Sequence, residues 1–172
     1  GVDVALKLHT KRSEHRTDGA RWRKELLERL VADGRAAKAV KALADDPLLG
    51  LVAPEGHLLP LKSHLGANAR RMDDLAQRAG LPIRDSTDCF PAGSMFWVRL
   101  ATIQPLLDAG LLYSDFEAEA GQIDGTLAHA IERSFGLCCR AAGFRLSTIA
   151  DLAGETTTPV TRYRYARSPQ NP

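Results

Sequence analysis

The sequence has few cysteines and no long hydrophobic run. Only three of its 172 residues are cysteines, and no two of these have Cys-x-x-Cys spacing, so the pattern predicts neither a disulfide framework nor a zinc site. Cysteines outside such a framework are typical of a reducing compartment, and we therefore expect a cytoplasmic protein. The uncharged apolar stretches are all much shorter than the roughly 20 residues of a membrane-spanning helix, which argues against a transmembrane segment.

The sequence also lacks the short motifs of several large enzyme classes. It contains no GxxxxGK[ST], GxGxxG, HExxH or GxSxG pattern, which argues against P-loop nucleotidases, dinucleotide-binding enzymes, zinc proteases and α/β-hydrolases. Its five histidines have no tight metal-ligand spacing. We therefore expect no dedicated metal site, although ligands from distant parts of the chain are compatible with the pattern.

Nor does the sequence carry a large net charge. Twenty-three Lys and Arg residues stand against 21 Asp and Glu residues, a net charge of +2, whereas a nucleic-acid-binding domain has a pronounced basic patch. We therefore expect no nucleic-acid partner. Residues 1–41 are more basic, with eleven Lys and Arg against six Asp and Glu. This segment is either a solvated helix face or a surface for phosphates or the inner face of an anionic membrane.

The apolar periodicity predicts an α/β fold. Strands are expected where apolar residues alternate or form short runs bounded by Gly and Pro, and helices where they recur every three to four residues. Strands are predicted at 2–8, 49–53, 90–100 and 144–149, and helices at 21–32, 36–44, 68–79, 102–109 and 126–142. Because the strands alternate with helices, we expect a mixed, mostly parallel sheet flanked by helices.

The length and the ends of the chain suggest a domain plan. Its 172 residues, 44% of them hydrophobic, are enough for one sizeable core. We expect a single domain over 1–153 and an extended or flexible tail over 154–172, which is rich in Thr, Arg and Pro. Because the chain starts at Gly1 rather than Met, we expect it to be a fragment of a longer protein.

Two segments carry candidate ligand-binding residues. His9, Lys11, Arg12 and Ser13 directly follow the first predicted strand, and ligands of open α/β sheets bind at strand ends. Their cations and hydroxyl group suit a phosphate or a sugar, although a simple polar turn has the same composition.

The second segment is 90–97, in which Gly93 and Ser94 open an apolar, aromatic strand. Glycine allows close approach of a ligand or another backbone, so Gly93, Ser94 and Trp97 are candidates to line a sugar site. Phe96 and Trp97 should point to opposite faces of the sheet. The alternative is a buried core strand with a bulge at Gly93.

The third candidate segment is an acidic loop that leads into the longest predicted helix. Glu119, Asp124 and His129 are candidate catalytic residues, because a carboxylate or imidazole here can accept a proton from a hydroxyl nucleophile. Arg133 lies one turn after His129 and could bind phosphate. Asp124 and Thr126 are equally suited to cap the helix, and the alternative for Glu132 and Arg133 is a local ion pair.

These segments together resemble the rhamnan synthesis protein F family of bacterial polysaccharide biosynthesis. The family pattern has a His-Thr-Lys-x-Ser element, a Gly-x-x-Trp-Arg helix, a Gly-Leu-Val-x-Pro-like strand, a Phe-x-Ala-Gly-Ser-Met-Phe-Trp element and a Glu-x-Gly-Gln-x-Asp-Gly-Thr-x-x-His-x-x-Glu-Arg element. They correspond here, in order, to 9–13, 19–23, 50–54, 90–97 and 119–133. The resemblance spans about residues 2–149.

The resemblance implies a glycosyltransferase-like domain that builds rhamnose-containing polysaccharide or lipopolysaccharide. It implies a nucleotide-sugar donor such as dTDP-rhamnose, a glycan or lipid-linked glycan acceptor, and association with the cytoplasmic face of the membrane. The layout also resembles the later part of a GT-A-type domain. Asp124 is then the expected base, with Glu119 second, and His129 and Arg133 orient it or hold phosphate.

One departure bears on the cofactor. The His9-Thr10-Lys11 element stands where a GT-A enzyme has a metal-binding Asp-x-Asp, and Mg²⁺ or Mn²⁺ requires such oxygen ligands. The departure leaves two alternatives open: a divalent Mg²⁺ or Mn²⁺ ion with other ligands, or the cations of this loop, which are suited to neutralise the leaving diphosphate in place of a metal. The alternative function is a non-catalytic module that binds a glycan or a partner enzyme in an assembly complex.

Overall fold

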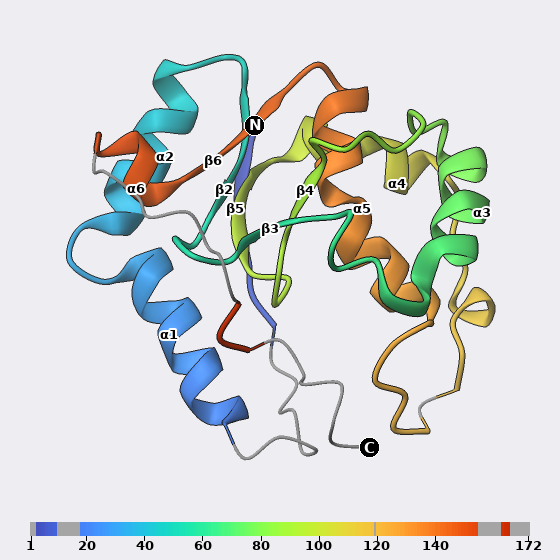
Figure 1. Cartoon of the computed structure of the whole chain (residues 1–172). Helices are drawn as coiled ribbons and strands as arrows, with labels where there is room; N and C mark the ends of the chain where they lie inside the picture. Colours follow the sequence, from blue (N-terminus) through green and yellow to red (C-terminus); the bar gives the residue numbers. More distant parts are fainter. Residues whose placement is uncertain (1–2, 10–17, 119, 155–162, 166–172) are drawn as a thin grey trace.

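The computed structural model describes residues 3–9, 18–118, 120–154 and 163–165, and within these ranges a four-stranded sheet forms the centre of the molecule (Figure 1). The sheet has the order β1-β5-β2-β6. Its strands are β1 (Val4–Lys7), β2 (Leu49–Ala53), β5 (Phe96–Arg99) and β6 (Arg145–Thr148). An α/β fold with a mixed sheet and flanking helices is confirmed.

The expectation of a mostly parallel sheet is wrong. β5 pairs antiparallel with both β1 and β2, and β2 pairs parallel with β6 alone. The chain enters β5 through a tight turn at the edge where β2 ends, so that β5 runs back against its neighbours. A periodicity pattern shows that a strand exists but carries no information about its direction.

The strand directions place several chain segments at one edge of the sheet. β1 and β2 run antiparallel to β5, and β6 runs parallel to β2. β1, β2 and β6 therefore all run in the same direction. Their carboxyl ends and the start of β5 therefore lie at the same edge. In open α/β sheets this kind of edge is the usual place for a ligand.

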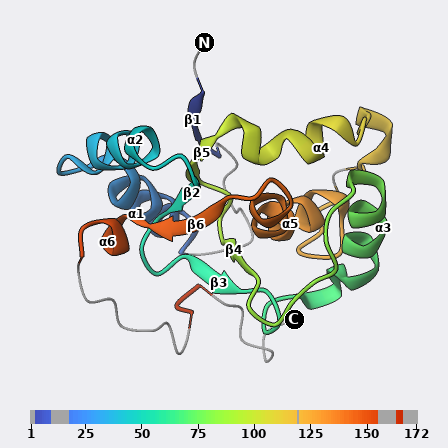
Figure 2. The same ribbon diagram turned by 90° about the horizontal axis from the view of Figure 1, so that it is seen from above.

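Helices cover both faces of the sheet, as Figure 2 shows from above. One face packs on α1, α2 and α6 around a core that includes Leu30, Leu43 and Val52. The other face packs on α5 and the helices beside it, around Phe96 and Phe135, whose ring centroids are 4.7 Å apart. The helices are α1 (Gly19–Val31), α2 (Arg35–Asp45), α3 (Ala69–Ala79), α4 (Gln104–Asp108), α5 (Leu127–Ala141) and α6 (Ile149–Leu152).

The remaining elements are short. A second sheet of two antiparallel strands joins β3 (Leu58–Pro60) to β4 (Cys89–Pro91), and single 3₁₀ turns occupy η1 (Gly66–Asn68), η2 (Leu100–Ile103) and η3 (Tyr113–Asp115). Within the described ranges, none of the helices is long and apolar enough to cross a membrane.

Most predicted elements are confirmed to within a few residues, but the predicted strand over 90–100 is wrong. It is divided into β4 and β5, because Gly93 and Ser94 both adopt positive φ angles of 87° and 56° and turn the chain between them. The opposite orientation of Phe96 and Trp97 is confirmed, since they pack on the two different cores. β3 was not predicted, because three residues are too few to show a period.

The predicted tail lies mostly outside the described residues. Its described part, 163–165, packs on the folded domain, and only 4% of the Tyr165 surface is exposed. The single domain over 1–153 stays a prediction.

The packing of α5 on β4 requires glycine at position 136. A Cβ atom there would lie 1.9 Å from the carbonyl oxygen of Cys89, which is backbone and cannot rotate away. We expect Gly136→Ala to lower the free energy of unfolding by about 3 kcal/mol, at the upper end of overpacking effects. The measurement is urea unfolding followed by circular dichroism.

Gly80→Ala is the control for that variant. Gly80 has a positive φ of 62° but open space around its Cα, so alanine there should cost only about 1 kcal/mol of backbone strain. Equal losses in the two variants would contradict the proposed clash.

Candidate functional site

The turn between β4 and β5 is the strained feature of the sheet edge. Among the described residues Ser94 is one of two non-glycine residues with a positive φ, a conformation that costs about 1–3 kcal/mol and concentrates at functional sites. α1 closes over the turn, because a Cβ atom on Gly93 would lie 2.7 Å from Leu26 Cδ1 and 3.2 Å from the Trp22 ring. The close approach expected at Gly93 is therefore made by side chains of α1.

Two opposite charges reach this turn from different elements. At the end of β1, Lys7 Nζ donates a hydrogen bond to the Ser94 carbonyl oxygen at 2.8 Å. From α5, Glu132 Oε1 accepts one from the Gly93 amide at 3.4 Å. These two described side chains do not form an ion pair with each other, so each charge is held by the backbone of the turn.

Burial moves both of these groups toward their neutral forms. It raises the pKa of Glu132, although the nearby charges of Arg133 and Lys7 act in the opposite direction. It also lowers the pKa of Lys7, which the charge of Glu132 partly opposes. A partly exposed carboxyl group with a raised pKa is a typical general base or acid.

Asp124, the expected base, is held in a hydrogen-bond network. Its Oδ2 accepts from the Ala67 amide at 2.9 Å, and its Oδ1 accepts from Asn68 Nδ2 at 2.5 Å. Burial alone would raise the pKa of Asp124, but these hydrogen bonds and the charge of Arg133 hold it below the usual range. These contacts suit a residue that fixes the loop before α5 to the start of α3 better than they suit a base.

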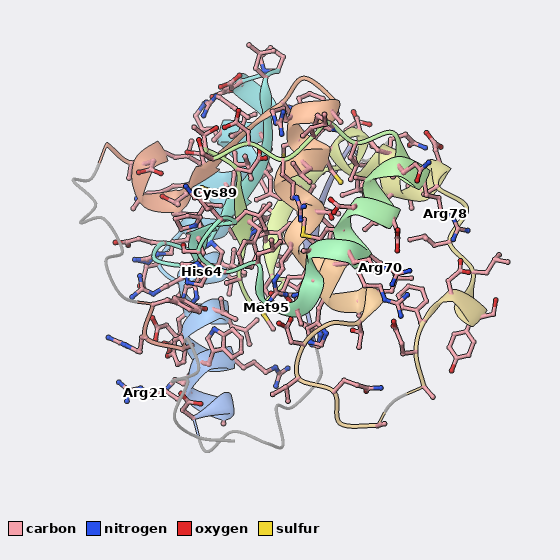
Figure 3. All side chains as sticks on the ribbon, turned by 45° about the vertical axis from the view of Figure 1, so that its right-hand side comes forward. Arg21, His64, Arg70, Arg78, Cys89 and Met95 are labelled. Carbon is pink, nitrogen blue, oxygen red and sulfur yellow. The ribbon has the colours of Figure 1, made fainter. Side chains whose placement is uncertain are left out.

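Arg133 connects this network to the sheet edge. Its Nη2 lies 3.3 Å from Asp124 Oδ1, and its Nε donates to the His64 carbonyl oxygen at 2.9 Å. The guanidinium carbon lies 5.5 Å from the centre of the Phe90 ring. The ion pair of Arg133 is therefore with Asp124 and not with Glu132. Figure 3 labels His64, and also Met95, which follows the strained turn.

His129 belongs to the start of α5. Thr126 is the N-cap, since its side chain accepts from the His129 amide at 3.4 Å, and its Oγ1 lies 2.7 Å from His129 Nδ1. Glu117 Oε2 accepts from the Leu127 amide at 2.9 Å, and its other oxygen pairs with Arg71. The structure thus settles the choice of capping residue between Asp124 and Thr126 in favour of Thr126.

The other candidate residues lie apart from this group or outside the described residues. Trp97 packs in the core under α1 and α2, where its Nε1 donates to the Leu30 carbonyl oxygen at 3.1 Å. His9 follows β1 and is half-buried. The remaining candidates are outside the described residues, namely Lys11, Arg12, Ser13 and Glu119.

A second cluster near the turn gave no signal in the sequence. Glu25 on α1 accepts a hydrogen bond from the Tyr165 hydroxyl at 2.5 Å and lies 3.6 Å from His57 Nε2. The Tyr165 ring stacks on Trp22, with centroids 5.4 Å apart, and on His57, with centroids 5.9 Å apart. His57 Nδ1 also meets the Tyr163 hydroxyl at 2.9 Å.

The described residues contain no group of three or more His, Cys, Asp or Glu side chains that could hold a metal ion.

The buried His57 should make the protein sensitive to acid. Burial lowers its pKa from 6.5 to about 4, against the opposing charge of Glu25. Above pH 6.5 the His57 imidazole is neutral in both the folded and the unfolded chain. Between pH 6.5 and 4 the imidazole is protonated in the unfolded chain but still neutral in the folded one, which favours unfolding. At about 1.4 kcal/mol per pKa unit, about 3 kcal/mol of stability should be lost across this window.

Urea unfolding at pH 7 and pH 4.5 measures this loss. His57→Gln should flatten the pH dependence, whereas His64→Gln, at a more exposed histidine, should leave it as it is. A wild-type slope retained in His57→Gln would show that other groups cause the acid sensitivity.

The contacts of Asp124 predict a cost in stability when the charge is removed. Asp124→Asn places an amide where two N–H donors point and leaves Arg133 without its carboxylate. We expect a loss of about 2 kcal/mol, the scale of hydrogen bonds to a charged group. Asp73→Asn is the matched control, since Asp73 is 63% exposed and pairs with Arg84, and it should cost under about 1 kcal/mol. Equal costs would remove the anchoring role of Asp124.

The comparisons with known proteins find one family and relatives of the chain. The sequence model of the rhamnan synthesis protein F family matches residues 2–144. Proteins called "Uncharacterized protein WxcX" from two strains of Xanthomonas campestris pv. campestris are each 51% identical over 167 residues. The match covers 96% of this chain but 24% of each relative, so the chain spans about a quarter of their length.

No solved structure matches the chain, so the resemblance to a GT-A-type domain stays a prediction. The family model covers five sixths of the sequence and includes β1, the strained turn and all of α5. The chain therefore belongs to the rhamnan synthesis protein F family, a family of polysaccharide biosynthesis.

Proposed function

We propose that the chain is a sugar-transferring domain in the synthesis of a rhamnose-containing polysaccharide, with Glu132 as its general base. The donor is a nucleotide-activated sugar, dTDP-rhamnose being the first to test, and the acceptor is a hydroxyl group of a growing glycan or lipid-linked glycan. The observation that carries the proposal is that the half-buried Glu132 accepts a hydrogen bond from the strained turn, to which Lys7 also donates one.

The reaction is a displacement at the anomeric carbon of the donor sugar. Glu132 takes the proton of the acceptor hydroxyl as its oxygen forms the bond to that carbon. The bond from the carbon to the diphosphate oxygen breaks, and the electron pair leaves with the nucleoside diphosphate. A base is most effective when its pKa lies close to the working pH, and burial raises the pKa of Glu132 in that direction.

Asp124 has a different part in this proposal. Because its oxygens accept hydrogen bonds from Ala67 and Asn68 and pair with Arg133, it is a positioning residue that acts through Arg133. Glu119 stays a prediction as a second carboxylate, and His129 stays a prediction as a phosphate-binding or orienting group. Gly93 and Ser94 shape the floor of the site through their backbone.

The cations near β1 complete the proposed centre. Lys7 fixes the turn through the Ser94 carbonyl oxygen and supplies a positive charge at the sheet edge. His9, Lys11, Arg12 and Ser13 follow β1 in the sequence, and we assign to them the neutralisation of the leaving diphosphate. This electrostatic task requires no metal ion when fixed cations are in place.

Glu132→Gln tests the proposal. Transfer of radiolabelled rhamnose from dTDP-rhamnose to a lipid-linked acceptor should fall by about 10²–10⁴-fold, the usual contribution of a general base. Stability should not fall at neutral pH. Because the pKa of Glu132 is raised in the folded state, its ionisation lowers the free energy of unfolding as the pH rises through that pKa. Glutamine does not ionise, so the variant lacks this loss.

Glu28→Gln is the control, since Glu28 is an exposed residue of α1 that pairs with Lys24. It should change neither transfer nor stability. Unchanged transfer by Glu132→Gln, or a large loss of stability in that variant, would show that Glu132 has only a structural role, as the acceptor that holds the Gly93 amide.

A non-catalytic glycan- or partner-binding module is the second candidate function. The observation that favours it is the chain's coverage of 24% of its relatives, which leaves most of those proteins to carry a catalytic centre elsewhere. This candidate predicts that the chain binds rhamnose-containing glycan but not dTDP-rhamnose, and that Glu132→Gln has no effect on that binding.

A further inference from the structure

A pocket of about 140 Å³ lies at the sheet edge, away from the strained turn. Glu55, which closely follows β2, and Ile149 and Ala150, which directly follow β6, line it on one side. β2 and β6 are the parallel pair of the sheet. The pocket therefore lies outside the carboxyl ends of two adjacent parallel strands, where open α/β sheets bind their ligands.

The wall of the pocket that faces these strand ends is cationic. It consists of Arg29 near the end of α1, and Arg35 and Lys38 in the first turns of α2. Two carboxylates also belong to the lining. Glu55 Oε2 lies 3.5 Å from Arg29 Nη1, and Asp33, which is largely exposed, lies 3.9 Å from Arg35 Nη1. Lys38 has no acidic partner among the described residues.

Arg29 is held in a fixed orientation. Its Nη1 donates to the Glu55 carbonyl oxygen at 3.1 Å, and its Nη2 lies 3.2 Å from Glu25 Oε1. Arg29 is thus a preorganised part of the wall. Arg35 and Lys38 are the cations with the weakest attachment to the protein, and they remain available to an anion.

The positions of Arg35 and Lys38 oppose the local electrostatics of their helix. The first turn of a helix carries a partial positive charge, so acidic residues stabilise it and cations do not. α2 has no acidic residue in its first turn, and its N-cap is Gly34, which has no side chain to cap the amides. Cations placed against this preference are explained by a negatively charged ligand that lies between them.

We propose that this pocket binds the phosphate or diphosphate group of a ligand. The size of the pocket limits the kind of ligand it can enclose, because sites that enclose a whole drug-sized molecule measure about 300–1,000 Å³. The pocket therefore holds an anionic group, and the rest of its ligand extends into solvent or along the sheet edge. Arginine contacts phosphate oxygens through its fork, and lysine contacts them as a point charge.

Isothermal titration calorimetry with pyrophosphate tests the pocket at constant ionic strength. We expect saturable binding of one pyrophosphate per chain. Arg35→Gln and Lys38→Gln should each weaken it by about tenfold, the effect expected for loss of one charge-assisted hydrogen bond. Both variants should fold, since each removes a cation from the positive end of a helix.

Lys41→Gln is the matched control. Lys41 lies on the same helix, is 76% exposed, pairs with Asp45 and is not part of the pocket lining. It should bind pyrophosphate as tightly as the wild type. Lack of saturable binding would overturn the proposal, and so would an equal loss in the Lys41 and Lys38 variants, which would indicate only general attraction to a basic surface.

Two further probes identify the source of the phosphate. dTDP carries the diphosphate of a nucleotide donor, and its competition would assign that diphosphate to this pocket in place of the loop after β1. Farnesyl diphosphate carries the diphosphate of a lipid-linked acceptor. Competition of either probe with pyrophosphate supports the pocket and assigns its source, whereas failure of both to compete contradicts it. Glu132→Gln should bind pyrophosphate normally, so that failure of this pocket and failure of the proposed base are separable.

Discussion

The reversal of the chain at Gly93 and Ser94 determines the direction of β5, and much of the molecule depends on that direction. Both residues have positive φ angles, so the turn costs backbone strain that the surroundings must offset. Lys7 and Glu132 contribute to this by hydrogen bonding to the carbonyl oxygen and amide of the turn. Because β5 pairs with β1 and β2 together, the turn also fixes where both of those strands end.

α5 places the acidic side chain at that turn. Gly136 lets the helix approach β4 until its Cα nearly touches the backbone of Cys89, and Phe135 packs edge-on against Phe96. At the other end of the helix, Arg133 and Asp124 tie its first turns to the start of α3. The helix is thus fixed at both ends, which gives Glu132 a defined position relative to the sheet.

Local patterns in the sequence were sufficient for most of the elements. A short apolar run bounded by Gly50 and Pro54 predicted β2 with its observed bounds, and the apolar period predicted α5 to within a residue at either end. The direction of β5 depends on a positive φ angle at Ser94, which serine rarely adopts, and the composition does not reveal it.

The site was harder to predict, because its members are far apart in the sequence. Lys7 and Ser94 are separated by 87 positions, and Gly93 and Glu132 by 39. Glu132 and Arg133 looked like a local pair, yet adjacent residues on a helix do not face each other. Arg133 accordingly pairs with Asp124, nine positions earlier, and Glu132 points to the turn.

Charged side chains have different surroundings at the two edges of the sheet, and this difference is the strongest physical argument for where the function lies. At the edge where β5 ends, Arg99 donates to three backbone carbonyl oxygens, those of Leu43, Asp46 and Leu49. There the charge closes loops and stabilises the fold. At the opposite edge burial moves Lys7 and Glu132 toward their neutral forms, and cations stand at the positive end of α2. Lys7 and Glu132 hold the turn, but the cations of α2 oppose the dipole of their own helix, so a ligand that interacts with those cations is the physical reason for keeping them.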